Sequence, residues 1–187
     1  MGDATLELVS YTDPYCTWCW GSEPMLRRLD QVYGGAVRLR FVMGGLVKDI
    51  SDFYDAANDI GGPEFYKQVA KHWLEASERH GMPVYDRIWY EMADEFRSTY
   101  PASLAYKAAQ LENGRKADRF LRKMREGAAA LGKMIHRSDV QLEMAGAVGL
   151  DGRMLKGNLE SGAAEREFRK DLADAVERGA RGFPTFL

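Results

Sequence analysis

The stretch that decides the fold is Asp13-Pro14-Tyr15-Cys16-Thr17-Trp18-Cys19-Trp20-Gly21, in a chain of 187 residues. It holds both cysteines of the sequence, spaced as C-x-x-C. A strand-forming run precedes it over residues 5–11, and residues 16–33 carry apolar side chains at helical spacing. We therefore expect Cys16 at a helix start, where unpaired backbone N–H groups favour a thiolate, and Cys19 one turn later, within disulfide reach. This placement predicts redox chemistry.

A structural zinc site is an alternative use of such a cysteine pair. Zinc takes four ligands, but the sequence has no second C-x-x-C, and the spacing of His72, His80 and His136 matches no common ligand pattern. A purely structural disulfide is a further alternative, although a bridge that closes so small a loop restricts the unfolded chain little. The sequence therefore favours a redox-active pair and predicts no metal and no cofactor.

Composition bounds the class of protein. A chain with 45% hydrophobic residues can build an ordinary globular core, as one domain or as one domain with a large insertion. Its 26 basic and 28 acidic residues give a net charge of −2, which disfavours nucleic acid as a partner. The sequence shows no membrane span, and its N-terminus lacks the pattern of a signal peptide. We expect a cytoplasmic protein, although a chain that began after a removed signal peptide would look the same.

The rest of the chain predicts one more strand and then a helical region. Residues 37–42 alternate apolar and basic side chains, so the chain opens with a β-α-β unit, which normally forms a parallel strand pair. Residues 51–178 carry mainly helical patterns, broken by glycine and proline. The predicted helices cover residues 63–81, 102–111, 116–131, 138–148 and 163–178.

Three groups of residues in the helical region are assigned no function. Basic residues between Arg115 and Arg125 are interleaved with acidic ones, which predicts a solvated helix face. Five aromatic residues are expected mainly in the core, some of them also facing a groove; they are Trp73, Trp89, Tyr90, Phe96 and Tyr100. The three histidines have no chemical partners nearby in sequence, so we expect surface or core positions for them.

The C-terminal residues Gly182-Phe183-Pro184-Thr185 form a second informative motif. Glycines end the preceding helix, and an apolar run then begins at a proline, which is typical of an edge strand or a tight turn. An X-Pro bond in such a place is a candidate for the cis form.

Residues 13–21 together with residues 182–185 resemble the DsbA-like branch of the thioredoxin superfamily, in particular its FrnE-like members. The resemblance implies an α/β, thioredoxin-like fold with a large all-helical insertion. Residues 1–50 would form the first part of the thioredoxin-like domain, residues 51–178 the insertion with the helix that returns to the core, and residues 179–187 the cis-proline strand. A closing hairpin and helix would follow Leu187, so we expect a truncated sequence, or a neighbouring chain that completes the sheet.

The same resemblance implies a protein disulfide oxidoreductase or isomerase that acts on protein or peptide thiols and disulfides. Cys16 would attack a substrate disulfide and Cys19 would resolve the mixed disulfide. Pro184 would be cis and face Cys16, and with Phe183 it would present backbone to the substrate. Glutathione or thioredoxin would be the redox partner.

Thr17 and Trp18, between the cysteines, are the expected redox-tuning residues, and Trp18 is also a candidate substrate-binding residue. Related proteins often carry proline at the Thr17 position, so the direction of electron flow stays open.

Two other functions remain open on the same fold. One is a 2-hydroxychromene-2-carboxylate isomerase or kappa-class glutathione transferase, although these enzymes usually keep a lone serine or cysteine at the Cys16 position. The other is an adaptor that delivers a client to a protease, with the cysteines as a redox sensor.

Overall fold

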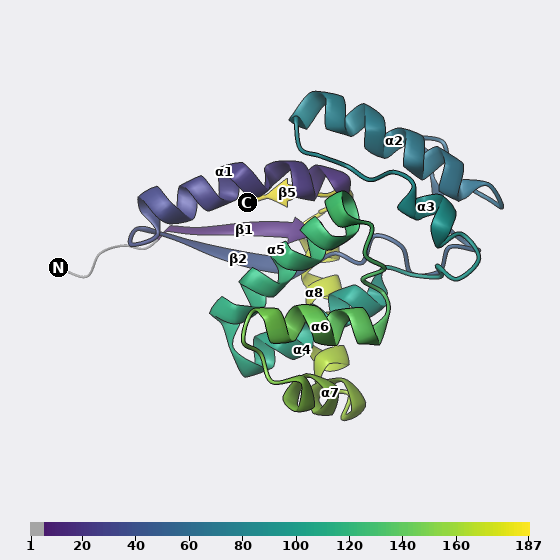
Figure 1. The fold of residues 1–187 in the computed structure, drawn as a ribbon. Coiled ribbons are helices and arrows are strands. Elements are labelled where there is room, and N and C mark those ends of the chain that lie inside the picture. Colours follow the sequence, from purple (N-terminus) through teal and green to yellow (C-terminus); the bar gives the residue numbers. More distant parts are fainter. Residues whose placement is uncertain (1–5) are drawn as a thin grey trace.

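The computed structural model describes residues 6–187 and shows a small sheet surrounded by helices (Figure 1). The chain opens with a strand, the helix of the cysteine motif and a second strand, and it ends in a short strand. The elements in chain order are β1 (Leu6–Thr12), α1 (Thr17–Tyr33), β2 (Val37–Met43), β3 (Tyr54–Asp55), β4 (Ile60–Gly61), α2 (Phe65–His80), α3 (Ile88–Glu91), α4 (Tyr100–Glu112), α5 (Gly114–Leu131), α6 (Ser138–Ala147), α7 (Gly152–Glu160), α8 (Ala163–Glu177) and β5 (Thr185–Phe186).

The main sheet has the strand order β2-β1-β5. β1 and β2 are parallel, with Leu6 beside Val37 and Thr12 beside Met43, which confirms the predicted β-α-β opening. β5 pairs antiparallel with β1 through Ser10 and Tyr11. This pairing brings the last residues of the chain beside the strand that leads into the cysteine motif.

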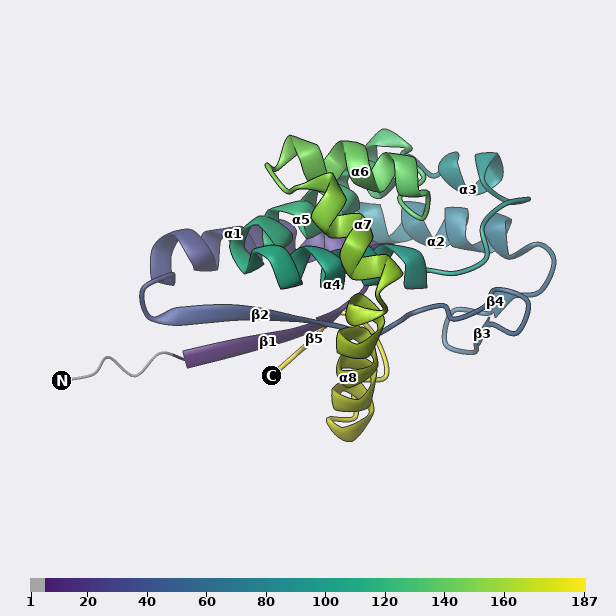
Figure 2. The same ribbon diagram turned by 90° about the horizontal axis from the view of Figure 1, so that it is seen from below.

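Helices cover both faces of the sheet. Successive side chains of a strand point to opposite faces, so Leu8 contributes to one hydrophobic cluster and Val9 to the other. The cluster of Leu8 is shared with α1 and α5, whereas the cluster of Val9 packs against Ala175 of α8. Figure 2 shows α8 on the opposite side of the sheet from α1 and α5.

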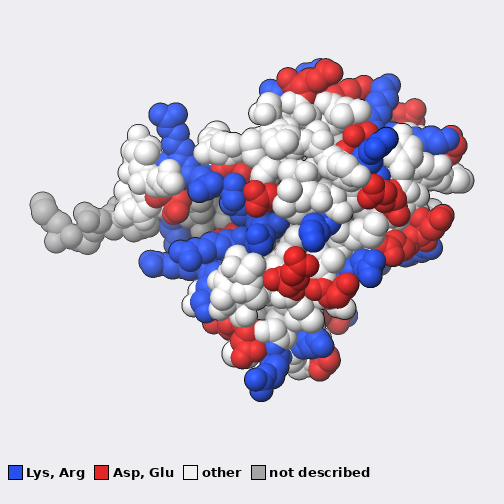
Figure 3. Space-filling model, in the orientation of Figure 1, with Lys and Arg blue, Asp and Glu red and all other residues white. Residues whose placement is uncertain are grey.

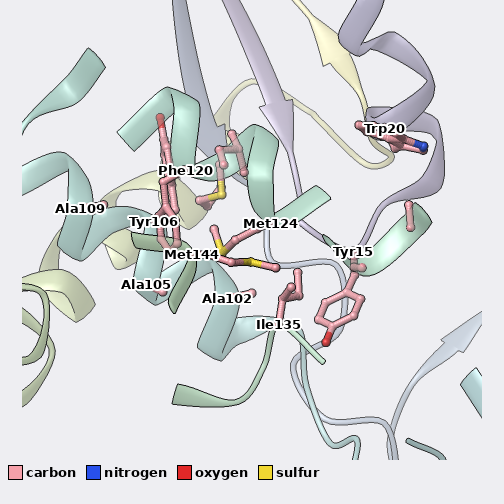
Figure 4. Close-up of a cluster of buried hydrophobic side chains, with 14 of the residues drawn as sticks. Tyr15, Trp20, Ala102, Ala105, Tyr106, Ala109, Phe120, Met124, Ile135 and Met144 are labelled. Atoms are coloured by element: carbon pink, nitrogen blue, oxygen red, sulfur yellow. The ribbon is translucent and has the colours of Figure 1, made fainter. Parts of the chain in front are cut away.

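The larger cluster joins the cysteine loop to the helical region. Figure 4 shows Ile135 between Met144 and the ring of Tyr15, the residue before Cys16. Tyr15 is 2% exposed and Ile135 is fully buried. Because protein interiors are closely packed, a displacement of the α5–α6 loop would also displace the loop that carries Cys16.

The region between β2 and β5 is mainly helical, but it contains four elements that the sequence did not predict, two of which are strands. It contains the short antiparallel pair β3–β4, together with the unpredicted helices α3 and α7. Asp59 adopts a left-handed conformation (φ 53°) in the β3–β4 turn, which is tolerated best by Asp, Asn and Gly. Two-residue strands carry too little alternation to be recognised from sequence.

On the face drawn in Figure 3, basic and acidic side chains are interspersed over the helical part of the molecule. Within residues 6–187, the helices include none that is long and apolar enough to cross a membrane.

Candidate functional site

Cys16 is the N-cap residue of α1, as predicted. Its backbone is extended (φ −75°, ψ 115°), and its Sγ accepts the backbone N–H of Cys19 at 3.3 Å. Both cysteines are free thiols. Cys16 is 7% exposed and Cys19 is fully buried, so a substrate can reach the pair only through Cys16.

The C-terminal motif lies against the first cysteine. The Phe183–Pro184 peptide bond is cis, and the Cys16 thiol donates to the carbonyl oxygen of Phe183 at 3.2 Å. Gly44, just after β2, makes this approach possible, because a Cβ there would lie 1.9 Å from the Phe183 ring. The structure thus brings together two motifs that lie 167 residues apart in the sequence.

A buried ion pair lies beneath the second cysteine. Arg125 of α5 donates to the carboxylate of Glu23 in α1 and to the hydroxyl of Thr12 at the end of β1. Arg125 is only 1% exposed, so the prediction of a fully solvated basic face on this helix is wrong at this residue. The apolar stripe of α5 contains Leu121 and Ala128, and helical spacing places Arg125 on the same face.

In the reduced pair the pKa values of Cys16 and Cys19 are shifted in opposite directions. Burial and the hydrogen bond to Cys19 raise the pKa of Cys16. Burial also opposes ionisation of Cys19, but the hydrogen bond from Cys16 and the charge of Arg125 outweigh it and lower the pKa of Cys19. The sequence predicted the stabilised thiolate at Cys16, whereas in the reduced structure burial raises the pKa of Cys16 and the lowered pKa is that of Cys19.

A buried carboxyl group anchors the loops around the pair. Asp13 accepts backbone N–H groups from Tyr15 and Leu46, each at 2.9 Å, and the hydroxyl of Thr99 at 2.8 Å. Asp13 is fully buried, and burial raises its pKa. It joins the cysteine loop, the loop after β2 and the start of α4, three segments that are far apart in the sequence.

A cavity of about 540 Å³ opens beside Cys16. Thr17, Trp18 and Phe183, all predicted site residues, line it together with aromatic residues of the helical region. Of the five predicted core aromatics, Trp73, Trp89 and Phe96 are buried and also line the cavity, Tyr100 is partly buried against the core, and Tyr90 is 52% exposed. More of the cavity lining is apolar than polar, as is common for binding sites.

All three histidines lie near the cysteine motif, which the sequence did not predict. His72 and His80 of α2 each contact the ring of Trp18 edge-on, at 6.3 and 5.9 Å between ring centroids. His136 accepts the hydroxyl hydrogen of Tyr15 at its Nδ1, at 2.8 Å. The contacting residues are 54 to 121 positions apart in the sequence, and no local sequence pattern predicts these contacts.

No group of three or more His, Cys, Asp or Glu side chains within residues 6–187 is arranged to hold a metal ion. The cysteine pair is accompanied instead by Arg125, Thr12 and the backbone N–H of Cys19. This set of hydrogen-bond donors and positive charge favours a thiolate within the pair.

A thioredoxin family model matches residues 9–187. The chain therefore belongs to the thioredoxin family, and its fold is similar to that of solved DsbA-like proteins, in agreement with the resemblance of the two motifs.

The curated relatives of this chain carry the name ClpXP adapter protein SpxH. The one from Halalkalibacterium halodurans is 32% identical over 182 residues, which are 97% of this chain and 58% of that protein. The one from Bacillus subtilis is 29% identical over 180 residues, 96% of this chain and 57% of that protein. The chain thus spans less than two thirds of the length of these relatives.

Solved structures with this fold include several enzymes. A candidate protein disulfide isomerase from Nitrosomonas europaea has a TM-score of 0.80 at 19% identity, over 97% of this chain and 83% of that one. The cytosolic disulfide reductase DsbM from Pseudomonas aeruginosa has a TM-score of 0.76 at 22% identity over the same shares, and it has also been solved with GSH. A 2-hydroxychromene-2-carboxylate isomerase reaches 0.66 at 16% identity, over 97% of this chain and 85% of that one, so the fold alone does not select a reaction.

Proposed function

We propose that this protein catalyses thiol–disulfide exchange through Cys16 and Cys19. The observation that carries the proposal is the position of Cys16, which caps α1, lines the cavity and accepts the N–H of Cys19. A second thiol one helical turn away can complete an exchange that a lone cysteine would leave as a mixed disulfide. The disulfide-exchange activities named for proteins of the same fold agree with this proposal.

The exchange starts with Cys19 as the thiolate, and its sulfur takes the proton of the Cys16 thiol. The Cys16 thiolate then forms a bond to one sulfur of the substrate disulfide, and the other sulfur leaves as a thiolate that takes the proton of Cys19. Cys19 attacks Cys16, the intramolecular disulfide forms, and the second substrate thiolate leaves and takes a proton from water. The substrate disulfide is reduced and the pair is oxidised; the reverse sequence donates a disulfide.

The cavity favours protein or peptide substrates. Phe183 and Pro184 would present backbone to a bound peptide, while Trp18 and the aromatic wall would contact its side chains. Glutathione or thioredoxin would restore the pair, and the DsbM structure with GSH is consistent with glutathione. The cytosolic assignment of DsbM agrees with the cytoplasmic location that we propose for this protein.

Trapping of a mixed disulfide tests the proposal. Cys19→Ser should accumulate a covalent adduct with a peptide disulfide at Cys16, because the resolving sulfur is gone, and mass spectrometry should locate the adduct. Cys16→Ser is the matched control and should form none. Equal labelling of both variants would contradict the proposal.

A role as a ClpXP adapter is the second candidate function. It rests on the name shared by the curated relatives, with which this chain is up to 32% identical. An adapter presents a client by surface contacts, so the cysteines would act at most as a sensor. The double variant Cys16→Ser, Cys19→Ser separates the two functions: retention of full cellular activity favours the adapter, whereas loss favours the oxidoreductase.

A further inference from the structure

His80, the last residue of α2, contacts both residues that separate the two cysteines. Its Nε2 lies 3.4 Å from the hydroxyl oxygen of Thr17, and its ring meets the Trp18 ring at 82° with 5.9 Å between centroids. Thr17 is 3% exposed, so its hydroxyl group has little access to water. One side chain of the helical region therefore contacts both Thr17 and Trp18, the two residues between the cysteines.

The hydrogen-bond partners of His80 determine which ring nitrogen carries the proton. Nδ1 accepts the backbone N–H of Met82 at 3.0 Å, so it holds no hydrogen in this arrangement. The hydrogen of the neutral ring is therefore on Nε2 and is donated to Thr17.

The segment that holds His80 is itself anchored on α1. Gly81 ends α2 in a left-handed conformation, with its N–H donated to the carbonyl of Ser77 at 2.8 Å. Trp20 of α1 donates its indole N–H to the carbonyl of Pro83 at 3.0 Å. Gly21 gives the imidazole room, because a Cβ at that position would lie 2.5 Å from Cγ of His80. The ring is thus confined between α1 and its own backbone turn.

We propose that His80 is a positioning residue for the Cys16–Cys19 pair, and that its Nε2–H bond to Thr17 sets the thiol–disulfide equilibrium. The inference rests on the proposed exchange function. Thr17 is the first residue of α1, and the same helical turn supplies the N–H of Cys19 to Cys16 Sγ. A displaced first turn weakens that N–H···S bond, which stabilises the reduced form, so the loss of His80 shifts the equilibrium toward the disulfide.

Equilibration with glutathione buffers, followed by trapping of free thiols, tests the inference in a double-mutant cycle. Thr17→Val removes the hydroxyl and keeps the shape, while His80→Asn keeps an acceptor for Met82 and removes the group that reaches Thr17. Each variant should favour the disulfide by about two- to tenfold, the range expected for one neutral hydrogen bond. The double variant should shift the equilibrium no further than the larger single change.

Two further variants separate positioning from a general structural role. His80→Gln places an amide N–H near the Nε2 position and should restore the wild-type equilibrium to within twofold. His72→Asn, on the other side of Trp18, should not couple to Thr17→Val. If His80→Asn does not fold, Thr17→Val decides: the proposal expects this variant to shift the equilibrium toward the disulfide, and an unchanged equilibrium would overturn it.

Additive shifts, or equal shifts in His80→Asn and His80→Gln, would overturn the role of His80 and leave the exchange function intact. If the wild-type protein forms no Cys16–Cys19 disulfide at any glutathione ratio, the exchange function itself fails, and the role of His80 fails with it.

Discussion

Arg125 of α5 is hydrogen-bonded to the buried carboxylate of Glu23 in α1, one turn after Cys19. The pair joins the helix of the cysteine motif to the helical region, and the guanidinium also lies 5.5 Å from the ring of Phe41 in β2. The charge of Arg125 is one of the contributions that lower the pKa of Cys19. One buried side chain therefore connects the packing of the fold with the chemistry of the thiols.

Arg125→Met should destabilise the fold and weaken ionisation of the second thiol. Loss of Arg125 leaves the buried Glu23 carboxylate with only Arg122 beside it, at 3.7 Å, and breaking a buried ion pair typically costs about 3–5 kcal/mol of unfolding free energy. Loss of the positive charge should also raise the pKa of Cys19. Chemical denaturation and a titration of thiolate absorbance measure the two effects.

Arg122→Met is the matched control, because Arg122 lies 3.7 Å from the same carboxylate but is partly exposed. It should cost less than about 1 kcal/mol. An Arg125→Met protein as stable as the wild type, with an unchanged thiolate titration, would contradict the account of the buried pair.

Gly44→Ala should disrupt the contact between the two motifs. A methyl group there would overlap the Phe183 ring, so the ring and the carbonyl that accepts the Cys16 thiol must move. We expect slower exchange with a peptide disulfide and little loss of helix content, checked by stopped-flow kinetics and circular dichroism.

Gly35→Ala serves as the control for Gly44, since a Cβ at Gly35 meets no atom within 4 Å. It should exchange at the wild-type rate. Equal rates for Gly44→Ala and Gly35→Ala would show that the position of Phe183 does not matter for the reaction.

The contribution of the three histidines to stability should decrease as the pH falls below about 6.5. Burial lowers the pKa of all three histidines, so below the ordinary histidine pKa of about 6.5 the unfolded chain binds more protons than the folded one. This contribution is therefore full above this pH and is lost as the pH falls toward the folded pKa values. Each histidine contributes a slope of at most about 1.4 kcal/mol per pH unit.

His136→Asn isolates one of these contributions. Asparagine can still accept the hydroxyl hydrogen of Tyr15, but it does not titrate. Urea unfolding between pH 7 and pH 5 should give a flatter pH dependence for this variant than for the wild type. A steeper one would show that His136 gains protons on folding, contrary to the burial that lowers its pKa.

The position of Cys16 and the strand pairing could be predicted from sequence because both depend on local patterns. A strand-forming run before the motif and helical spacing after it place Cys16 at a helix start, and the alternation in residues 37–42 predicts the partner strand. The burial of Arg125 and Glu23 could also have been predicted, since helical spacing places each of them among the buried residues of its own helix.

The contacts around the motif could not be predicted in the same way. His80 and His136 reach it over 63 and 121 residues, and a side chain's role in such contacts depends on how separate helices pack. The unequal protonation of Cys16 and Cys19 likewise arises from burial, which a motif does not reveal.

The reduction equilibrium of the Cys16–Cys19 pair in glutathione buffers tests the central claim most directly. The account predicts a reversible intramolecular disulfide that forms in a single two-electron transition. A potential near that of thioredoxin, about −270 mV, would indicate a reductant, and one approaching about −120 mV a disulfide donor. If no Cys16–Cys19 disulfide forms at any glutathione ratio, the exchange mechanism is contradicted.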